Sequence, residues 1–532
     1  MFRITGLTVP LDATPAELQR LCARTLHVRP QDLLSVQTVR KAVDARNRED
    51  VRFVITADIQ VRSGAAQHVR TTGKVTKAPV PEPFPQLPAY SGALRPVVVG
   101  SGPAGLFAAL TLARAGASPV LLERGAPVEE RVQDIRDLRE HGLLHPDSNV
   151  QFGEGGAGTF SDGKLTTGTK SPWIRHVLET FVLHGAPEEI LTDAKPHIGT
   201  DLLRSVILSI RREIQSLGGE VCFHSRLEGI RCSAAQTYEL LVRTPDGTEC
   251  FPAQDVFLCL GHSARDTMQM LYAFGLPMEQ KPFAMGVRIE HPQAWIDRAQ
   301  YGRFAGHPAL HAADYKLHVQ TPDTRGCYTF CMCPGGEVMA ASSEDGRLAV
   351  NGMSEHARSA VNANSALLVG IRPDDFGSDH PLAGIELQRT LEAKAFRLGG
   401  GGYHAPVQRV EDFLLSRPTN RLGEVLPSYR PGITLCSLDD CLLPFMAEDL
   451  RIGITRMDRM LHGFAHPDAL LTALESRSSS PVRVVRDENG MSVGFPGIYP
   501  VGEGAGYAGG IVSAAVDGIV QAMRMLERRK AP

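Results

Sequence analysis

A glycine-rich run, Gly100-Ser101-Gly102-Pro103-Ala104-Gly105, has the residue types and spacing in this chain that are best suited to chemistry. It directly follows the apolar stretch 97–99. In this pattern Gly100 allows a tight turn out of a buried strand, Gly102 lets the backbone approach a pyrophosphate, and Gly105 allows a helix to pack closely on the strand. The helix that follows offers unpaired N–H groups to an anion. The run therefore predicts a dinucleotide-binding βαβ unit.

Glu123 supports this prediction, because it ends a second apolar stretch, 119–122, close to the expected offset of about 20 residues. A carboxylate at this position can accept hydrogen bonds from both hydroxyls of an adenosine ribose. We assign Glu123 and its neighbour Arg124 to the cofactor, and the details favour FAD over NAD.

A third candidate segment, 151–165, is dense in glycine and shows no pattern of helix or strand. Its backbone can press against a planar ring, and its N–H groups can meet phosphate or flavin oxygens. We therefore expect Gly155 and Gly156 to contact the cofactor, with Lys164 as an anion partner. The alternative is a flexible surface loop.

The C-terminal segment 502–511 resembles the second FAD signature of the glutathione-reductase-like superfamily. The resemblance implies that Gly502 and Glu503 lie at the ribityl chain, and that a helix beginning near Gly510 and Ile511 points its N-terminus at the pyrimidine edge of the flavin. Such a helix end stabilises the negative charge of a reduced flavin. Glu503 stands where the family usually has Asp, one methylene shorter. The alternative is a glycine-rich loop before an ordinary core helix.

Nearly the whole chain resembles a bacterial family of FAD-dependent dehydrogenases. The family implies FAD and a redox reaction, and it implies no particular substrate. It also implies that Leu227 and Gly261, at the ends of the predicted strands 220–227 and 255–261, lie near FAD. The stretches that carry the resemblance are 502–511, 331–336, 351–354, 362–367, 286–293 and 475–482.

Catalytic candidates beyond the cofactor are few. His262 follows a β-like run, where an imidazole could transfer a proton, although it could equally satisfy a backbone carbonyl. Arg477 and Arg288 could bind an acidic group of a substrate or serve as structural ion-pair partners. Cys331 and Cys333 could perform redox chemistry, but a disulfide at this spacing is strained, and packing is the favoured interpretation.

Composition excludes several classes of function. The chain has 532 residues and a net charge of −3, so no global charge favours nucleic acid or an anionic membrane. The start lacks a signal-peptide pattern, and no apolar stretch is long enough to span a membrane. We expect a cytoplasmic protein with reduced thiols and no bound metal, because its ten cysteines show no zinc-type CxxC pairs.

These residues must be positioned by an α/β fold. We predict an N-terminal βαββ module over 1–80 and a proline-rich linker over 81–95. A Rossmann-type FAD-binding domain should then occupy 96–280 and 486–532, with a mixed α/β substrate domain inserted at 281–485. Thr14, Pro15 and Glu17 predict a capped helix in the module. The linker suggests that few contacts join the module to the rest.

The function expected from these elements is hydride transfer between flavin N5 and a small molecule. The glycines at 399–402 follow no convincing strand, so no second dinucleotide fold is expected, and NAD(P)H would dock only transiently as an electron donor. The alternative is a flavin-containing binding or scaffold protein whose N-terminal module recruits a protein partner or RNA.

Overall fold

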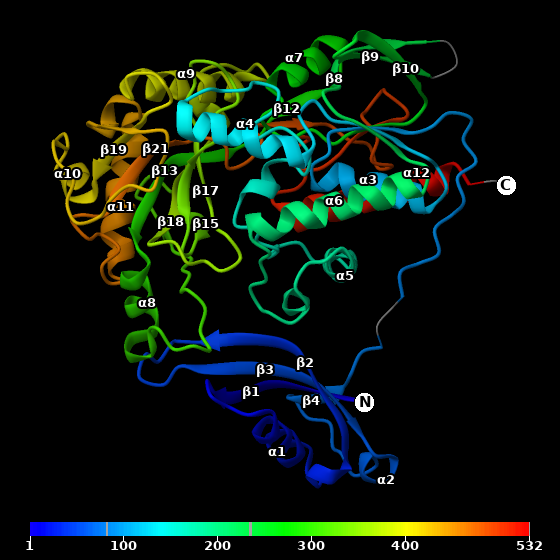
Figure 1. Cartoon of the computed structure of the whole chain (residues 1–532), viewed down its shortest axis with the longest axis vertical. Helices are drawn as coiled ribbons and strands as arrows, with labels where there is room; N and C mark the ends of the chain where they lie inside the picture. The colour runs from blue at the N-terminus through cyan, green and yellow to red at the C-terminus, as the bar shows by residue number, and fades with distance from the viewer. Residues whose placement is uncertain (81–82, 234–236, 531–532) are drawn as a thin grey trace.

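A five-stranded parallel sheet forms the centre of the FAD-binding part of the chain (Figure 1). The computed structural model describes residues 1–80, 83–233 and 237–530. Val97–Val99 is buried along its whole length, as expected for a parallel strand covered on both faces. In spatial order the strands are β23 (Ile498–Pro500), β11 (Val256–Leu258), β5 (Val97–Val99), β6 (Val120–Leu122) and β7 (Glu220–Cys222).

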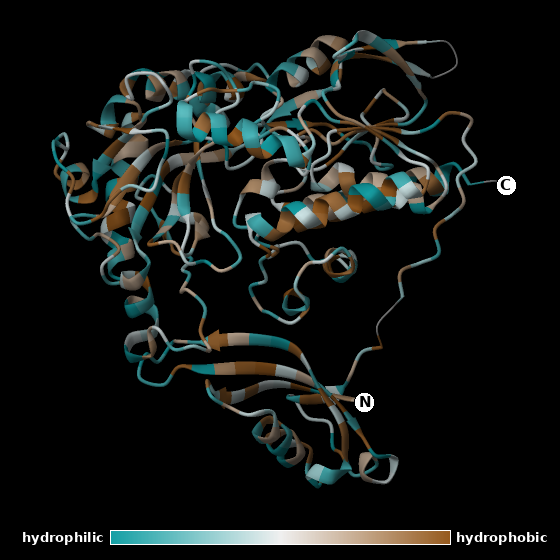
Figure 2. Cartoon of the chain, viewed as in Figure 1, coloured by the Kyte–Doolittle hydropathy of each residue, from teal (hydrophilic) through white to brown (hydrophobic). Residues whose placement is uncertain are grey.

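Helices cover this sheet. Every residue from Ala104 to Ala113 of α3 is buried, because the helix packs against β5, α6 and α12. By contrast, α4 is mostly hydrophilic (Figure 2). The helices of this part are α3 (Pro103–Arg114), α4 (Val128–His141), α5 (Trp173–Leu183), α6 (Thr200–Ser216), α7 (Arg265–Phe274) and α12 (Ile511–Arg528), with short turns η2 (Ala157–Phe160) and η3 (Glu188–Leu191).

A second, seven-stranded sheet forms the insert. Its central strands β13 and β18 are almost entirely buried. In spatial order the strands are β14 (His318–Gln320), β15 (Gly326–Cys333), β18 (Asn362–Ile371), β13 (Phe283–Pro292), β21 (Leu470–Glu475), β19 (Ala405–Arg409) and β20 (Ile433–Leu435). The other elements are α8 (Gln293–Tyr301), α9 (Ala383–Leu398), α10 (Val410–Leu414), α11 (Pro444–Asp458), β16 (Glu337–Ala340), β17 (Val350–Met353) and the turns η5 (Gly302–Phe304), η6 (Pro373–Phe376) and η7 (Leu438–Asp440).

The chain leaves and re-enters the FAD-binding part through one antiparallel pair. Strand β12 (Met278–Gln280) runs beside β22 (Val482–Val484). The pair holds the two ends of the insert together, so the FAD-binding part is built from two separated stretches of sequence. The predicted fold class, a discontinuous Rossmann-type domain with a mixed α/β insert, is confirmed.

One predicted strand is wrong in detail. The stretch 220–227 was expected to be continuous, but β7 ends at Cys222 and β8 (Arg226–Cys232) belongs to another sheet, with β9 (Tyr238–Thr244) and β10 (Gly247–Ala253). His224 lies between them with φ +52°, a left-handed conformation that breaks an extended strand. Leu227 therefore lies in the three-stranded sheet.

The N-terminal module has one strand more than the predicted βαββ. Its sheet order is β2-β3-β1-β4, and Thr14 and Glu17 form the predicted capping box. The elements are β1 (Phe2–Pro10), α1 (Pro15–Leu26), η1 (Pro30–Asp32), β2 (Leu33–Asp44), β3 (Arg52–Val61), α2 (Ser63–Ala66) and β4 (Val75–Lys77). Within the linker, 81 and 82 lie outside the described residues, and 83–95 form neither helix nor strand.

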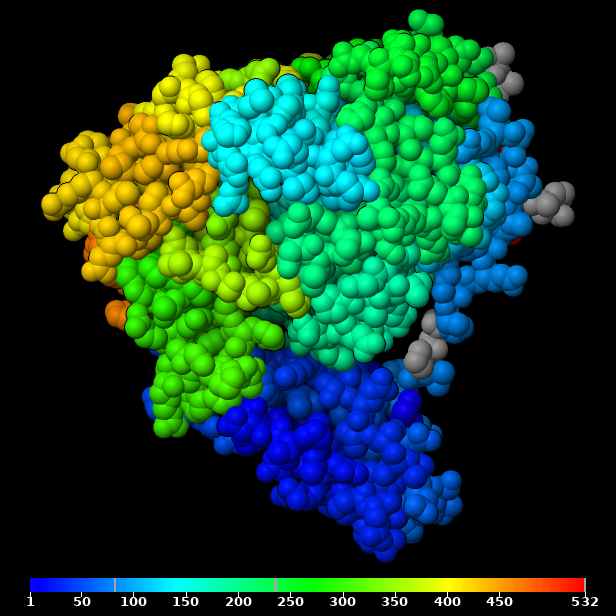
Figure 3. Space-filling view, in the orientation of Figure 1, coloured from blue at the N-terminus to red at the C-terminus, as the bar shows by residue number. Residues whose placement is uncertain are grey.

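The described contacts between the module and the rest of the chain are few, but they include backbone pairing. The module lies at one end of the molecule, in blue, against the insert (Figure 3). Strand β2 pairs with a loop of the FAD-binding part, because Lys41 N donates to Thr192 O at 2.8 Å and Ala194 N donates to Lys41 O at 2.9 Å. Arg303 of the insert also donates to Glu49 O at 2.7 Å.

None of the helices that the structure describes is long and apolar enough to cross a membrane.

Candidate functional site

A long cleft lies between the FAD-binding part and the insert. The carboxyl ends of β5, β6 and β11 form one wall, where ligands bind in open α/β sheets. The insert forms the opposite wall with residues of β15, β17 and β21. The predicted site residues in its lining are Gly100, Gly102, Pro103, Ala104, Glu123, Arg124, Gly156, Lys164, Leu227, Gly261, His262, Arg477, Glu503, Gly510 and Ile511.

The other four predicted residues, Ser101, Gly105, Gly155 and Gly502, lie behind the lining. Ser101 is fully buried, and its backbone oxygen accepts a hydrogen bond from Gly155 N at 2.9 Å. A side chain at Gly105 would meet Gly100 O at 1.8 Å, so Gly105 allows helix α3 to pack against the β5 turn. Gly502 N donates to Asp517 at 2.7 Å. These residues support the wall of the cleft.

Helix α3 opens into the cleft without a side-chain cap. Its N-cap is Gly102, which leaves the N–H groups of the first turn free to meet an anion. A Cβ atom built on Gly102 would have only the Cα of Gly156 within 4 Å, at 3.9 Å. The space in front of this helix end is therefore open, as the binding of a pyrophosphate requires.

Glu123 is held in one position by four hydrogen bonds. Its carboxylate accepts from Ser101 N at 2.8 Å, Ser101 Oγ at 2.7 Å, Gly125 N at 2.9 Å and Gly153 N at 3.0 Å. Only 5% of the residue is exposed, yet it lies in the lining. The carboxylate is thus positioned to accept further hydrogen bonds from ribose hydroxyls.

The segment 151–165 wraps along the cleft and holds only the short turn η2. Gly156 lies against Gly102, and a Cβ atom on Gly158 would lie 3.0 Å from Ile511. Further along, Arg358 Nη2 lies 2.6 Å from Asp162 Oδ2. The segment therefore runs from the N-terminus of α3 past that of α12, and the alternative of a flexible surface loop does not describe it.

Helix α12 presents a second uncapped N-terminus to the same cleft. Its N-cap is Gly510 with φ +93°, and a Cβ atom there would meet nothing within 4 Å. Glu503, at the end of β23, lies beside His262 with Oε1 3.4 Å from Nδ1. These features fit FAD. The cleft has two helix ends that favour anions, an open approach at Gly102 and a fixed carboxylate at Glu123.

His262 is a buried titratable side chain in the lining. It is only 6% exposed, and neither ring nitrogen has a hydrogen-bond partner among the described residues. Its contact with Glu503 is close but is not aligned as a hydrogen bond. A buried imidazole normally has a partner, so this one is free to receive a ligand.

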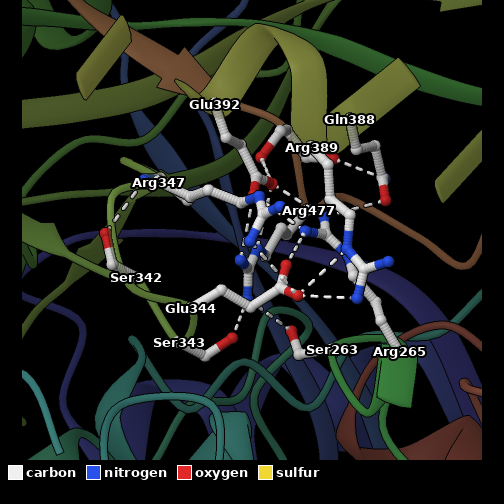
Figure 4. A network of polar contacts seen from close by, with 12 residues as sticks. Ser263, Arg265, Ser342, Ser343, Glu344, Arg347, Gln388, Arg389, Glu392 and Arg477 are labelled. Carbon is white, nitrogen blue, oxygen red and sulfur yellow. Dashed lines mark hydrogen bonds and ion pairs between the residues drawn. The ribbon is translucent and has the colours of Figure 1, made fainter. Parts of the chain in front are cut away.

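Arg477 lies in the lining, but its guanidinium is already bound (Figure 4). It donates to Glu392 Oε1 at 3.2 Å and to Ser263 Oγ at 3.0 Å, and it contacts Ser343. Arg265 binds the other side of Glu392, with Nη2 2.7 Å from Oε1. These contacts favour a structural role for Arg477 as an ion-pair partner over a role in binding substrate.

Glu392 joins the two halves of the fold. Burial alone would raise the pKa of its carboxyl, but the guanidinium groups of Arg265 and Arg477 lower it well below its usual range. Arg265 begins α7 of the FAD-binding part, whereas Glu392 lies on α9 of the insert. The cluster thus fixes the insert against the strand end that carries His262.

Glu475, Cys331 and Cys333 line the insert wall, and Arg288 lies behind them, outside the lining. Arg288 is fully buried and pairs with Glu475 at 3.3 Å, which favours its structural interpretation. Burial raises the pKa of the Glu475 carboxyl. The guanidinium of Arg288 lowers this pKa by less than burial raises it, so the net shift is upward. Burial also raises the pKa of Cys333 to about 12. A shift in strand pairing between Phe330 and Cys333 interrupts β15, so Cys331 and Cys333 do not lie in a regular strand.

Several lining residues were missed from the sequence: Phe330, Asn351, Glu475 and Ser478. They come from strands far apart along the chain. Three of them, Asn351, Glu475 and Ser478, lie in stretches that carried the family resemblance, and this was the signal that could have identified them.

Comparison with protein families gives three matches along the chain. Residues 282–478 match the family described as FAD-dependent protein, C-terminal domain-like. Residues 95–131 match an FAD binding domain, and residues 1–60 match a domain of unknown function.

Comparison with solved structures gives matches of low sequence identity and low TM-score. A flavoprotein/dehydrogenase from Cytophaga hutchinsonii is 10% identical, with 82% of this chain and 80% of that chain covered and a TM-score of 0.33. A geranylgeranyl bacteriochlorophyll reductase-like protein from Thermoplasma acidophilum is 12% identical, with coverages of 82% and 79% and a TM-score of 0.36. Glycine oxidase from Geobacillus kaustophilus is 12% identical, with coverages of 84% and 96% and a TM-score of 0.34.

A curated relative matches the chain from end to end. This protein from Clostridium beijerinckii, named only as an uncharacterized protein, is 44% identical over 533 residues, which cover 100% of this chain and 99% of the relative. Since the identity extends over the whole length and includes both FAD-related regions, the chain belongs to the same family of FAD-dependent proteins.

Proposed function

We propose that this protein is an oxidoreductase that transfers a hydride between FAD and a small molecule bound against the insert wall of the cleft. One observation carries the proposal. Two uncapped helix N-termini, those of α3 and α12, open into one cleft whose lining also contains the buried, unpartnered His262.

Distinct residues would hold the cofactor. The first turn of α3 at Gly102 would bind the pyrophosphate, and Glu123 would accept hydrogen bonds from the ribose hydroxyls. Glu503 and the N-terminus of α12 would bind the ribityl chain and the pyrimidine edge. When bound, FAD supplies hydride transfer through N5.

Residues of the chain would transfer the substrate proton. Glu503 lies near Nδ1 of His262 and favours the tautomer with the proton on that nitrogen, which leaves Nε2 to accept or return a substrate proton. The insert forms the opposite wall of the cleft with residues of β15, β17 and β21. Arg477, held by Glu392, Ser263 and Ser343, would position the wall and would not touch the substrate.

The test is anaerobic reduction of the bound flavin by a panel of metabolites that includes NADH and NADPH. We expect at least one metabolite to bleach the flavin quickly. The two nicotinamides should reduce it slowly and without a stable complex, because the described residues form only one dinucleotide fold. Absorbance at the flavin maximum and a binding titration measure both effects. A flavin that no reductant bleaches would favour the binding-protein alternative, and tight binding of NADPH would contradict the transient-donor proposal.

His262→Gln should separate the proton-transfer role from the thiols. The variant should keep its flavin content and lose turnover on the order of 10²-fold or more, the scale of general acid–base catalysis. Replacing Cys331 and Cys333 together by Ser should change turnover little. Stopped-flow reduction by the metabolite that the panel identifies measures both variants. An inactive thiol variant beside a fully active His262→Gln would favour a dithiol relay coupled to FAD.

A further inference from the structure

Lys164 is the cation in the cleft lining that lacks a carboxylate. Two other cations lie there, and both are paired: Arg124 Nη2 is 2.9 Å from Asp266 Oδ1, and Arg477 Nη2 is 3.1 Å from Glu392 Oε2. Within the part of the chain that the structure describes, the Lys164 ammonium has neither an ion pair nor a hydrogen bond.

The nearby carboxylates are already occupied. Asp162 pairs with Arg358 at 2.6 Å and also binds Ser354, while Glu475 pairs with Arg288 at 3.3 Å. Neither acid depends on Lys164 for its counterion. The positive charge of Lys164 is therefore left for a ligand.

This charge acts at the insert wall of the cleft. Burial raises the pKa of Cys331 and of Cys333, and Lys164 is among the groups that lower both. Asp162, two residues before Lys164, binds Arg358 and Ser354 of the insert, so this part of the segment lies beside the insert. The helix end at Gly102, by contrast, is approached by Gly156, eight residues earlier in the same segment.

Phe330 adds an apolar surface to the same cleft lining. It precedes Cys331 on β15, lies in the lining and is 41% exposed. A large aromatic side chain left open in a cleft gains stabilisation when an apolar ligand covers it. An unpaired cation and an uncovered aromatic ring in the lining of one cleft are complementary to a ligand that has both an anionic and an apolar part.

We infer that the substrate has a carboxylate that pairs with Lys164 and an apolar part that packs on Phe330. The inference rests on the proposed function, because it places this ligand where a flavin substrate would bind. A phosphate of the cofactor offers the same anionic chemistry to Lys164, so the experiment must distinguish the two sources. Lys164 is thus assigned to the substrate, whereas the sequence alone suggested that it binds the cofactor.

The test compares phenylacetate with phenylacetamide, which share a ring and differ in charge. Isothermal calorimetry on the FAD-loaded protein should show phenylacetate binding about 10- to 100-fold more tightly, the range for a hydrogen bond to a charged group. Lys164→Gln should remove this difference and keep full FAD content, while Lys164→Arg should retain most of it. Phe330→Ala should weaken both probes alike.

Lys170→Gln is the matched control, since Lys170 is exposed and lies outside the lining. It should change neither FAD content nor probe binding. The inference is overturned if the two probes bind equally or if neither binds. It is also overturned if Lys164→Gln loses FAD while Lys170→Gln keeps it, because the cation then serves the cofactor. Calorimetry needs no turnover, so a flavin that resists reduction would contradict the proposed function and leave this result readable.

Discussion

Replacing Gly102 by valine is expected to give a folded protein that no longer binds FAD. Gly102 has φ −67° and ψ 179°, a conformation that valine adopts readily. A Cβ atom there would meet only Gly156 Cα, at 3.9 Å, so the fold itself is not strained. The branched side chain would instead fill the space in front of α3 that the pyrophosphate needs. Flavin absorbance after reconstitution should be close to zero.

Two controls make this result interpretable. Gly168→Val changes a glycine that lies outside the cleft lining with nothing within 4 Å of its Cβ position, and it should retain stoichiometric FAD. The circular dichroism of apo Gly102→Val should match that of the wild-type apoprotein. Full flavin content in Gly102→Val would place the pyrophosphate elsewhere. Gly105→Val is not informative, because its Cβ atom would meet Gly100 O at 1.8 Å and disturb the helix packing itself.

The cofactor end of the cleft was predictable because its constraints are local. A buried strand, a turn with positive φ at Gly100 and an uncapped helix lie within about 20 residues, and Glu123 ends the next strand. Each residue type follows from the geometry required at its own position. The same reasoning placed His262 just after a predicted strand, and the structure brings it to the lining in the loop that follows β11.

The insert wall and the docking of the N-terminal module were not predictable in this way. Glu475 and Arg288 are 187 positions apart, and Glu392 lies 127 positions from Arg265. No local periodicity indicates such pairs, because their partners are chosen by the tertiary fold. The module was expected to stand apart because its linker is rich in proline, but the linker carries no information about β2, whose edge pairs with Thr192 and Ala194.

Glu392→Gln should cause the largest loss of stability. Arg265 and Arg477 have side chains that are 1% and 2% exposed, and the substitution removes the carboxylate that both share. Arg265 would keep Glu344, at 2.6 Å, whereas Arg477 would keep only hydroxyl partners and a neutral amide. Breaking a buried pair from one side typically costs about 3–5 kcal/mol, because it leaves a charge uncompensated in a medium of low polarity. Urea unfolding followed by circular dichroism measures this loss.

Glu386→Gln is the matched control on the same helix. Glu386 pairs with Arg389 at 2.8 Å, but its side chain is 58% exposed, and an exposed pair contributes about 0–1 kcal/mol. The two variants make the same chemical change on α9 and differ in burial. Similar losses in both would mean that the Arg265–Glu392–Arg477 cluster is not the element that fixes the insert. A large loss in Glu392→Gln alone, with weakened flavin binding, would show that the cluster holds the wall opposite the cofactor in place.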